Sequence, residues 1–196
     1  MNATKNLYKF MSKGKVLGLK DKLLWEHSVG AAIAARTIAQ KVNNRYAEQA
    51  FLGGLLHDIG KLVLLQKVPE HFDSVIEEVY NTGRHFYEVE MEILGFTHAE
   101  VGGYLMNKWK STSDFEEAVR LHHMVSAELD VEGQLVYYID LANKFCHKLG
   151  IGFLNEPEKD LTQEYSAIVL GLNEQMLDGI ESTVKHLMKQ EINLFM

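Results

Sequence analysis

The chain has 196 residues, of which 46% are hydrophobic and only 2 are proline. This length can bury one sizeable core, and no stretch has the composition of a linker, so a single domain over residues 1–196 is expected. The formal net charge is -7, and the 20 basic residues are scattered along the chain. This distribution argues against a nucleic-acid polymer or an anionic membrane surface as a partner.

The cysteine content and the N-terminus indicate the cellular compartment. Cys146 is the single cysteine, so it cannot form an intramolecular disulfide, and its helical spacing from Ala142 and Leu149 predicts a core position. No run approaches the roughly 18 apolar residues of a membrane span, and the first residues lack the apolar region of a signal peptide. We therefore expect a cytoplasmic protein in a reducing environment.

Apolar residues recur at three- and four-residue spacings along nearly the whole chain, which is typical of helices. The first stripe covers residues 24–42 and places His27 on the first turn of its helix. A second helix is expected over about residues 46–56, where Gly53 and Gly54 allow another backbone to come close.

That second helix delivers His57 and Asp58 at its end. Gly60 then predicts a break in the chain, and Pro69 begins a further helix that stops near Gly83. Proline is favoured in the first turn of a helix, and glycine is favoured just after its last turn.

Two later helices are indicated by their first residues. Thr97 followed by Glu100 is a capping-box signature, which places His98 at the first position of a helix. Residues 113–116 repeat the signature and open a helix on which His122 points toward the core.

Residues 135–149 carry another clear stripe, with Asp140 beside it. Two more helices are expected, one over about residues 161–170 and one in the remainder of the chain. Neither strand alternation nor a sequence repeat is visible. The predicted fold class is therefore all-α, a helical bundle with a motif-bearing core at about residues 23–149 and C-terminal helices at residues 161–196.

The adjacent pair His57 and Asp58 is the strongest chemical signal in the chain. Burying such a polar pair among apolar residues costs free energy unless something satisfies it, and a metal ion bound by both side chains would do so. Five histidines and two aspartates together form the candidate set of metal ligands, namely His27, His57, Asp58, His98, His122, His123 and Asp140. Any one of these histidines alone is more often a structural residue, but that interpretation must be repeated several times to dismiss the set.

Imidazole and carboxylate ligands together favour a divalent transition-metal ion such as Zn, Fe, Mn, Ni or Co over Ca or Mg. Seven candidates could hold two ions, with Asp58 as the natural bridge between them. Two such ions would clamp a phosphoryl group and activate a water molecule. Lys61 could then place its ammonium group on a phosphate oxygen, although a lysine after a helix-ending glycine is equally an ordinary partner of a helix C-terminus.

Other histidines and acidic residues fall outside this set. Glu88, Glu90 and Glu92 alternate as on a solvated helix face, so no catalytic role is expected for them. The remaining histidines are interpreted as surface or core-edge residues, namely His71, His85, His147 and His186.

The order of His27, the pair His57-Asp58, and Asp140 resembles the defining pattern of the HD phosphohydrolase superfamily. Four fuller motifs are similar to its HDOD (HD-related output domain) branch, at residues 25–28 (WEHS), 54–62 (GLLHDIGKL), 95–102 (GFTHAEVG) and 118–123 (AVRLHH). The resemblance covers about residues 23–149. It implies a helical bundle built around a metal site, usually in bacterial signalling.

The expected cofactor is one or two divalent ions of Fe, Mn, Ni or Zn, and the same resemblance implies how the ligands would divide between two of them. One ion would be held by His27, His57, Asp58 and Asp140, and the other by Asp58, His98, His122 and His123. The residues after His123 contain no Gly-Tyr-Pro, so the chain does not resemble the HD-GYP group that hydrolyses cyclic di-GMP. We therefore expect cyclic di-GMP to be neither a good substrate nor a tight ligand.

Two functions remain open from the sequence. The first is a metal-dependent phosphohydrolase that acts on a nucleotide or another small phosphoester, with Asp58 and Lys61 as catalytic residues. The second is a non-catalytic HDOD regulatory module whose metal site is structural or senses a ligand, with a signalling protein as its partner. The complete ligand set favours the first function. The second is favoured because many HDOD domains resemble signalling modules. We narrowly favour the enzyme.

Overall fold

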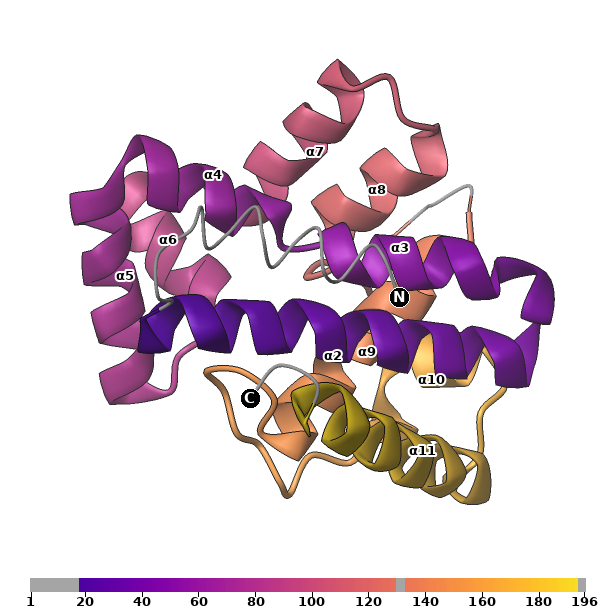
Figure 1. Cartoon of the computed structure of the whole chain (residues 1–196). Helices are drawn as coiled ribbons and strands as arrows, with labels where there is room; N and C mark the ends of the chain where they lie inside the picture. Colours follow the sequence, from indigo (N-terminus) through magenta and orange to yellow (C-terminus); the bar gives the residue numbers. More distant parts are fainter. Residues whose placement is uncertain (1–17, 130–132, 194–196) are drawn as a thin grey trace.

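The computed structural model describes residues 18–129 and 133–193, and the regular structure within these ranges is entirely helical (Figure 1). No strand occurs in them, which confirms the predicted all-α fold class. The elements in chain order are α2 (Leu19–Val42), η1 (Asn44–Tyr46), α3 (Ala47–Leu56), α4 (Ile59–Lys67), α5 (Pro69–Thr82), α6 (Phe86–Leu94), α7 (His98–Lys108), α8 (Ser113–Leu121), α9 (Leu135–Leu149), η2 (Leu161–Gln163), α10 (Tyr165–Val169) and α11 (Glu174–Asn193).

The long helix α2 is the central element, and α3, α9 and α11 pack against it (Figure 1). The largest hydrophobic core lies among these helices and includes the fully buried side chains of Val29, Ile38, Ile139 and Phe145. Small residues allow α2 and α3 to approach closely, because a Cβ atom added to Gly54 would lie 2.5 Å from the carbonyl oxygen of Ala31. The predicted close approach at this glycine is therefore confirmed.

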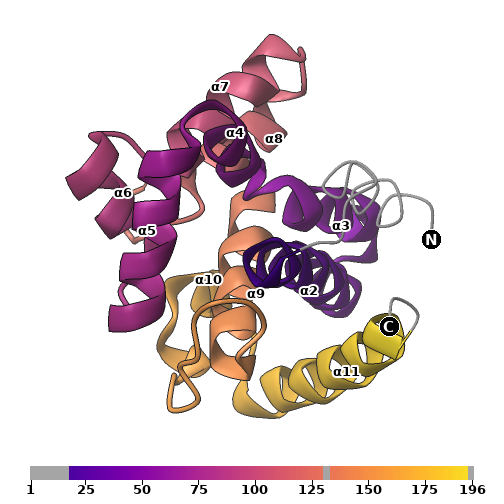
Figure 2. The ribbon, with the colours of Figure 1, turned by 60° about the vertical axis from the view of Figure 1, so that its left-hand side comes forward.

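The remaining helices form two smaller packed groups beside α2. Helices α5 and α6 lie to one side, and α7 and α8 lie beyond α4 (Figure 2). A second core, which includes Phe72, Val79 and Phe86, joins α5 and α6, and a third joins Ile59, Met106 and Val119 of α4, α7 and α8. Because α4 contacts both α5 and α7, the junction between α3 and α4 lies where these groups meet.

Two details near the candidate ligands differ from the sequence expectations. Helix α2 begins at Leu19, so His27 lies about two turns inside it rather than on its first turn. Gly60 does not break the chain but lies inside α4, because the bend occurs earlier, at the pair His57 and Asp58. The missing side chain of Gly60 is needed for packing, since an added Cβ would lie 1.9 Å from the carbonyl oxygen of His98.

Two helix boundaries were also predicted wrongly. The signature at residues 113–116 predicted a capping box that begins at Ser113. The residue that caps α8 is instead Thr112, one position earlier, and its side chain makes no capping hydrogen bond. The helix expected over residues 161–170 is split into η2 and α10. Glu164 between them has an extended backbone, and its carboxylate lies 2.6 Å from Nζ of Lys144. Within the ranges described above, no helix is both long and apolar enough to cross a bilayer.

Candidate metal centre

Asp58 lies at the bend between α3 and α4. His57 is the C-terminal cap of α3, and Asp58 is the N-terminal cap of α4. Their residues are 0% and 5% exposed, respectively. Because α3 packs on α2 and α4 packs on α7, the bend carries this polar pair between helices that are distant in sequence.

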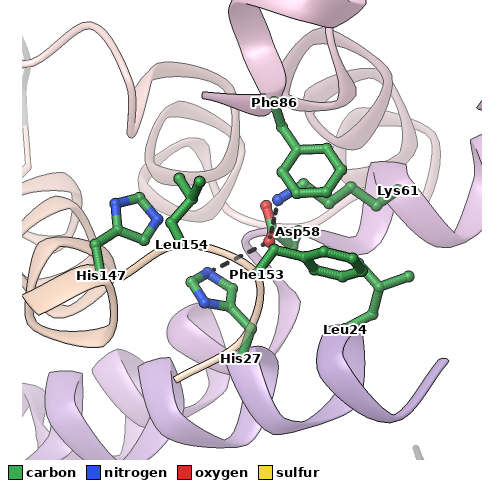
Figure 3. A pocket seen from close by; sticks show the side chains of 8 residues that line it. All are labelled: Leu24, His27, Asp58, Lys61, Phe86, His147, Phe153 and Leu154. Carbon is green, nitrogen blue, oxygen red and sulfur yellow. Dashed lines mark hydrogen bonds and ion pairs between the residues drawn. The ribbon is translucent and has the colours of Figure 1, made fainter. Parts of the chain in front are cut away.

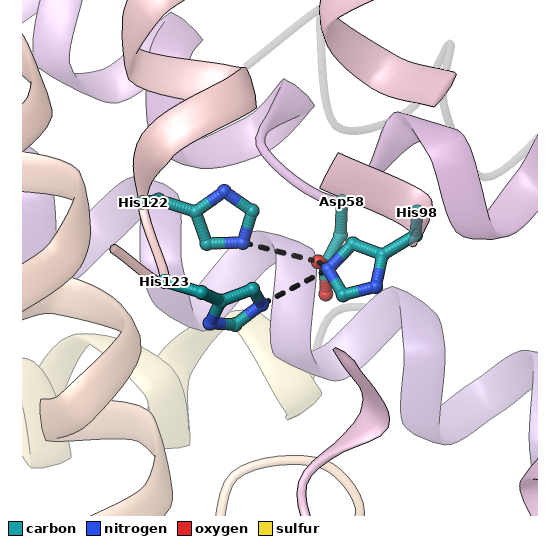
Figure 4. Close-up of side chains that lie close together, drawn as sticks. All are labelled: Asp58, His98, His122 and His123. Atoms are coloured by element: carbon teal, nitrogen blue, oxygen red, sulfur yellow. Dashed lines mark hydrogen bonds and ion pairs between the residues drawn. The ribbon is translucent and has the colours of Figure 1, made fainter. Parts of the chain in front are cut away.

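Histidines from α7 and from the end of α8 lie beside one oxygen of Asp58 (Figure 4). Oδ1 of Asp58 is 3.0 Å from Nε2 of His98 and 3.8 Å from Nε2 of His122. Nε2 of His123 is 3.0 Å from Nε2 of His98. Each of these four residues offers a ligand atom within 4.8 Å of the others, so one ion could contact all four.

A second group of ligand atoms faces the other oxygen of Asp58. Nε2 of His27 in α2 and Nε2 of His57 each lie 3.5 Å from Oδ2 of Asp58. These three residues also offer ligand atoms within 4.8 Å of one another. Asp58 thus belongs to both groups, with one carboxylate oxygen facing each, which is the placement of a carboxylate that bridges two ions.

The buried histidine rings are fixed by hydrogen bonds on the side away from Asp58. Nδ1 of His57, His122 and His27 each pairs with a backbone carbonyl oxygen, at 2.7, 2.8 and 3.1 Å. A carbonyl oxygen only accepts hydrogen bonds, so Nδ1 carries the proton in each pair. In the neutral ring Nε2 therefore presents a lone pair toward Asp58, the tautomer that binds a metal.

His98 is fixed by a carboxylate instead of a carbonyl group. Oε2 of Glu90 accepts hydrogen bonds from the backbone N–H of His98 at 2.7 Å and from Nδ1 at 2.6 Å, and both side chains are fully buried. The interpretation of Glu90 as a solvated residue is therefore wrong. Its helical spacing from Phe86 and Val89 places it on the buried face of α6, and that spacing was the signal that could have found it.

Two buried nitrogens at this site have no hydrogen-bond partner among the described residues, Nε2 of His57 and Nε2 of His122. Leaving a polar atom buried without a partner costs about 1–3 kcal/mol, and a bound metal ion would remove that cost. Burial lowers the pKa of His57 to about 4 and that of His122 well below its usual value. Both rings are therefore neutral near pH 7, the form that binds metals, so these residues fit the expected ions.

The charges on Asp58 and His98 are set by their neighbours. Burial alone would raise the pKa of Asp58, but His57, Lys61 and His98 together hold it well below its usual value. Burial alone would lower the pKa of His98, but the carboxylates of Glu90 and Asp58 raise it above its usual value. Asp58 is therefore the anion that a metal ion requires as a ligand.

Lys61 lies in the first turn of α4 and directs its ammonium group at Asp58 (Figure 3). Nζ is 2.6 Å from Oδ2 of Asp58 and 4.1 Å from the centre of the Phe86 ring, and the residue is 5% exposed. The alternative interpretation, a partner of a helix C-terminus, is wrong because Lys61 lies near the N-terminus of its helix.

Asp140 is the predicted ligand that the described structure places apart from both groups. Its Oδ2 accepts hydrogen bonds from Oγ of Ser166 at 2.5 Å and from Nζ of Lys144 at 2.9 Å. Burial raises the pKa of Asp140. Burial lowers the pKa of His27, and the Asn143 side chain, one turn further along α9, lies close enough to that ring to raise its pKa slightly against this larger effect. Helix α9 thus brings an amide to the first group, rather than the predicted carboxylate.

Two cavities reach the site from different sides. The first measures about 20 Å³, room for about one water molecule, and is lined by Leu24, His27, Asp58, Lys61, Phe86, His147, Phe153 and Leu154 (Figure 3). The second measures about 640 Å³ and reaches the site at His123. It is lined by Tyr87, Glu88, Met91, Thr97, Ala99, Glu100, Arg120, Leu121, His123 and Met124.

Comparison with known proteins identifies related sequences. The model of the HDOD domain family matches residues 3–125. An uncharacterized protein from Treponema pallidum (strain Nichols) is 24% identical over 149 residues, which are 73% of this chain and 29% of the relative. The chain therefore spans less than a third of that curated relative.

Solved structures share the fold. An HDOD domain protein of unknown function from Geobacter sulfurreducens matches with a TM-score of 0.82 and 22% identity, covering 95% of this chain and 66% of that one. A candidate signal transduction protein from Marinobacter aquaeolei VT8 has a TM-score of 0.68 and 21% identity, covering 84% and 38%. A candidate phosphohydrolase from Shewanella amazonensis SB2B has a TM-score of 0.64 and 22% identity, covering 87% and 61%.

Proposed function

We propose that this chain, which belongs to the HDOD domain family, is a metal-dependent phosphohydrolase that acts on a nucleotide or another small phosphoester. The observation that carries the proposal is the position of Asp58. Its two carboxylate oxygens face two separate groups of imidazole nitrogens, 3.0–3.8 Å away. Buried unpartnered nitrogens in each group further support a pair of bound ions over a purely structural cluster.

The ligands proposed for the first ion are His27, His57 and Asp58. Those proposed for the second ion are Asp58, His98, His122 and His123. Divalent Fe, Mn, Ni or Zn suits both sets, since each combines imidazoles with a carboxylate. When bound, two such ions would polarise a phosphoryl group and lower the pKa of a bound water molecule.

The protein's own residues would position the substrate and exclude bulk water. Nδ1 hydrogen bonds hold the ligand rings before substrate arrives, so little reorganisation is needed during the reaction. Lys61 would donate a hydrogen bond from Nζ to a phosphate oxygen. The 20 Å³ cavity beside Lys61 has room for one phosphate oxygen or one water molecule, but not for the organic part of a phosphoester.

The larger cavity at His123 supports an organic phosphoester as the substrate. Its volume of about 640 Å³ suits a small ligand. Tyr87, Met91 and Leu121 offer apolar and aromatic contacts for a base or another organic group. Arg120 lies in the same cavity and offers a cation for a phosphate at the end near His123.

The test is a phosphoesterase panel with the full chain loaded separately with Mn, Fe, Ni or Zn, using mononucleotides, cyclic nucleotides and generic phosphoesters. The wild type should hydrolyse at least one class, and Asp58→Asn should abolish that activity while retaining its helical circular dichroism. His71→Gln, an exposed residue of α5, is the matched control and should keep full activity. Cyclic di-GMP belongs in the panel as a nucleotide that we expect not to be cleaved.

A regulatory module is the second candidate function. It is favoured by the burial of the site, since His57, His98 and His122 are 0% exposed and the cavity at Lys61 holds about one water molecule. In that case the ions would hold α2, α4, α7 and α8 together, and a signalling protein would be the partner. Metal-loaded wild type that hydrolyses nothing in the panel would replace the enzyme proposal with this one.

A further inference from the structure

A third group of metal-ligand side chains lies outside the proposed catalytic site. It consists of His85 at the N-terminal cap of α6, His147 in α9, and Glu156 in the segment after α9. From the sequence, both histidines were expected to be surface or core-edge residues. Ligand atoms of all three lie within 4.8 Å of one another.

We propose that His85, His147 and Glu156 bind a divalent transition-metal ion of the zinc type, in a site separate from the Asp58 groups. Two imidazoles and one carboxylate, with a water molecule as the fourth ligand, are a ligand set that zinc uses in proteins. Nε2 of His85 lies 3.2 Å from Oε1 of Glu156. Ligands bound about 2.0–2.1 Å from one tetrahedral ion are separated by about 3.3 Å, so this pair already has the required spacing.

His147 is the observation that points to a ligand. It is 7% exposed, and neither of its ring nitrogens has a hydrogen-bond partner within the described ranges. Its ring stacks on that of His27 at 5.7 Å and lies 5.3 Å from that of His85. The ring can therefore offer a nitrogen lone pair to an ion shared with His85 and Glu156.

The backbone and a lysine hold Glu156 in place beside the two rings. The backbone N–H of Glu156 donates to the carbonyl oxygen of His147 at 2.8 Å, which ties the loop to α9. Nζ of Lys159 lies 2.9 Å from Oε2 of Glu156 and leaves Oε1 directed at His85. Such support of a ligating carboxylate by a second residue is common around bound metals.

The site adjoins the proposed catalytic centre without sharing a ligand with it. His147 lines the small cavity together with His27, Asp58 and Lys61 (Figure 3). An ion on His147 would therefore sit at the wall of that cavity and add positive charge near the position of a phosphate. The alternative to a metal site is that His85 and Glu156 form only an ion pair with each other.

Zinc content of the full chain distinguishes these two cases. Protein saturated with Zn²⁺ and then dialysed should keep one fewer zinc per chain in His85→Ala and in Glu156→Gln than in the wild type. His71→Ala, an exposed histidine outside every group, should match the wild type. His85 and Glu156 have side chains 29% and 28% exposed, so both variants should fold, which circular dichroism would verify. Equal zinc content in all four proteins would overturn the proposal.

A second readout needs no substitution in the third site itself. On saturation with Zn²⁺, the ring-nitrogen NMR signals of His85 and His147 should shift, and unchanged signals would overturn the proposal. The result is separable from the proposed function, because Asp58→Asn should lose the central ions while the His85 signal still responds to zinc. Failure of the third site would leave the Asp58-dependent ions in place.

Discussion

Glu90 controls the orientation of His98 from a different helix. Its Oε2 accepts both the backbone N–H and the Nδ1–H of His98, at 2.7 and 2.6 Å. A carboxylate behind a ligating imidazole fixes the tautomer and makes the other nitrogen more basic. Glu90 is thus a positioning residue for the proposed metal centre, although it does not belong to either ligand group.

The first prediction follows from this contact. Glu90→Gln keeps an oxygen that can accept from His98 but removes the negative charge, so affinity for a divalent ion should fall by about 10–100-fold. Competition with a fluorescent chelator would measure the change. Glu92→Gln, on the exposed side of the same helix and paired with Arg84, is the control and should not alter affinity. Equal affinities in the two variants would contradict the role given to Glu90.

A second prediction concerns the buried pair of Lys61 and Asp58, whose charged atoms are 2.6 Å apart. In metal-free protein Lys61→Met leaves the buried carboxylate of Asp58 without its ammonium partner, which should lower the free energy of unfolding by about 3–5 kcal/mol. Bound metal ions compensate the same carboxylate, so this loss should shrink in metal-loaded protein. Urea unfolding with chelator and with Mn²⁺ measures both values.

The control for Lys61 is a surface pair of the same composition. Nζ of Lys20 lies 2.5 Å from Asp73, but the side chains are 39% and 51% exposed. Lys20→Met should therefore cost less than about 1 kcal/mol with or without metal. If Lys61→Met lowers the free energy of unfolding by as little as this, or by the same amount with and without metal, bound ions do not compensate the charge of Asp58. Turnover in Lys61→Met should also fall without loss of bound metal.

At the scale of the helices, the contact between α4 and α7 sets the distance between Asp58 and His98. Gly60 makes this contact possible, because a Cβ there would lie 1.9 Å from the carbonyl oxygen of His98. Gly60→Ala should force α4 and α7 apart, lower the free energy of unfolding by about 1–3 kcal/mol, and weaken metal binding.

Gly179 is the matched control for this third prediction. It lies on the exposed side of α11, and an added Cβ there meets no atom within 4 Å. Gly179→Ala should therefore stabilise the protein, by up to about 1 kcal/mol, since alanine favours a helix more than glycine does. Thermal unfolding and metal titration of both variants are the measurements. Stabilisation by Gly60→Ala would show that the helices do not meet as closely as described.

Helix positions were predictable where local signals decide them. Pro69, Gly83 and the capping box of Thr97 with Glu100 mark boundaries that the structure retains. The break predicted at Gly60 was wrong, because glycine often ends a helix. Here Gly60 lies within α4 and allows close contact with α7. That contact depends on tertiary packing, which no local pattern contains.

Across the whole chain, the sequence motifs predicted some residues of the candidate site and missed others. The motifs named residues from α2, α3, α7 and α8 that the fold brings together, because each motif marks a helix end or a buried stripe. Asp140 and Asn143 were not separable from the sequence, since both lie beside the same stripe of α9 and only packing decides which reaches His27. His85 and Glu156 were missed because they are 71 residues apart in sequence and meet only through the return of the chain after α9.

The fourth prediction is that metal removal destabilises the whole bundle, because the proposed ligands join helices that are distant in sequence. A ligand that binds only the folded state at 1,000 times its Kd stabilises it by about 4 kcal/mol. For a chain of this size, each kcal/mol corresponds to about 2–4 °C in melting temperature, so chelation should lower the Tm by about 10 °C. Differential scanning fluorimetry with excess chelator or with Mn²⁺ would measure this shift. Asp58→Asn should lose most of it and His71→Ala should retain it, whereas a wild-type Tm that is the same in chelator and in Mn²⁺ would show that no ion joins these helices.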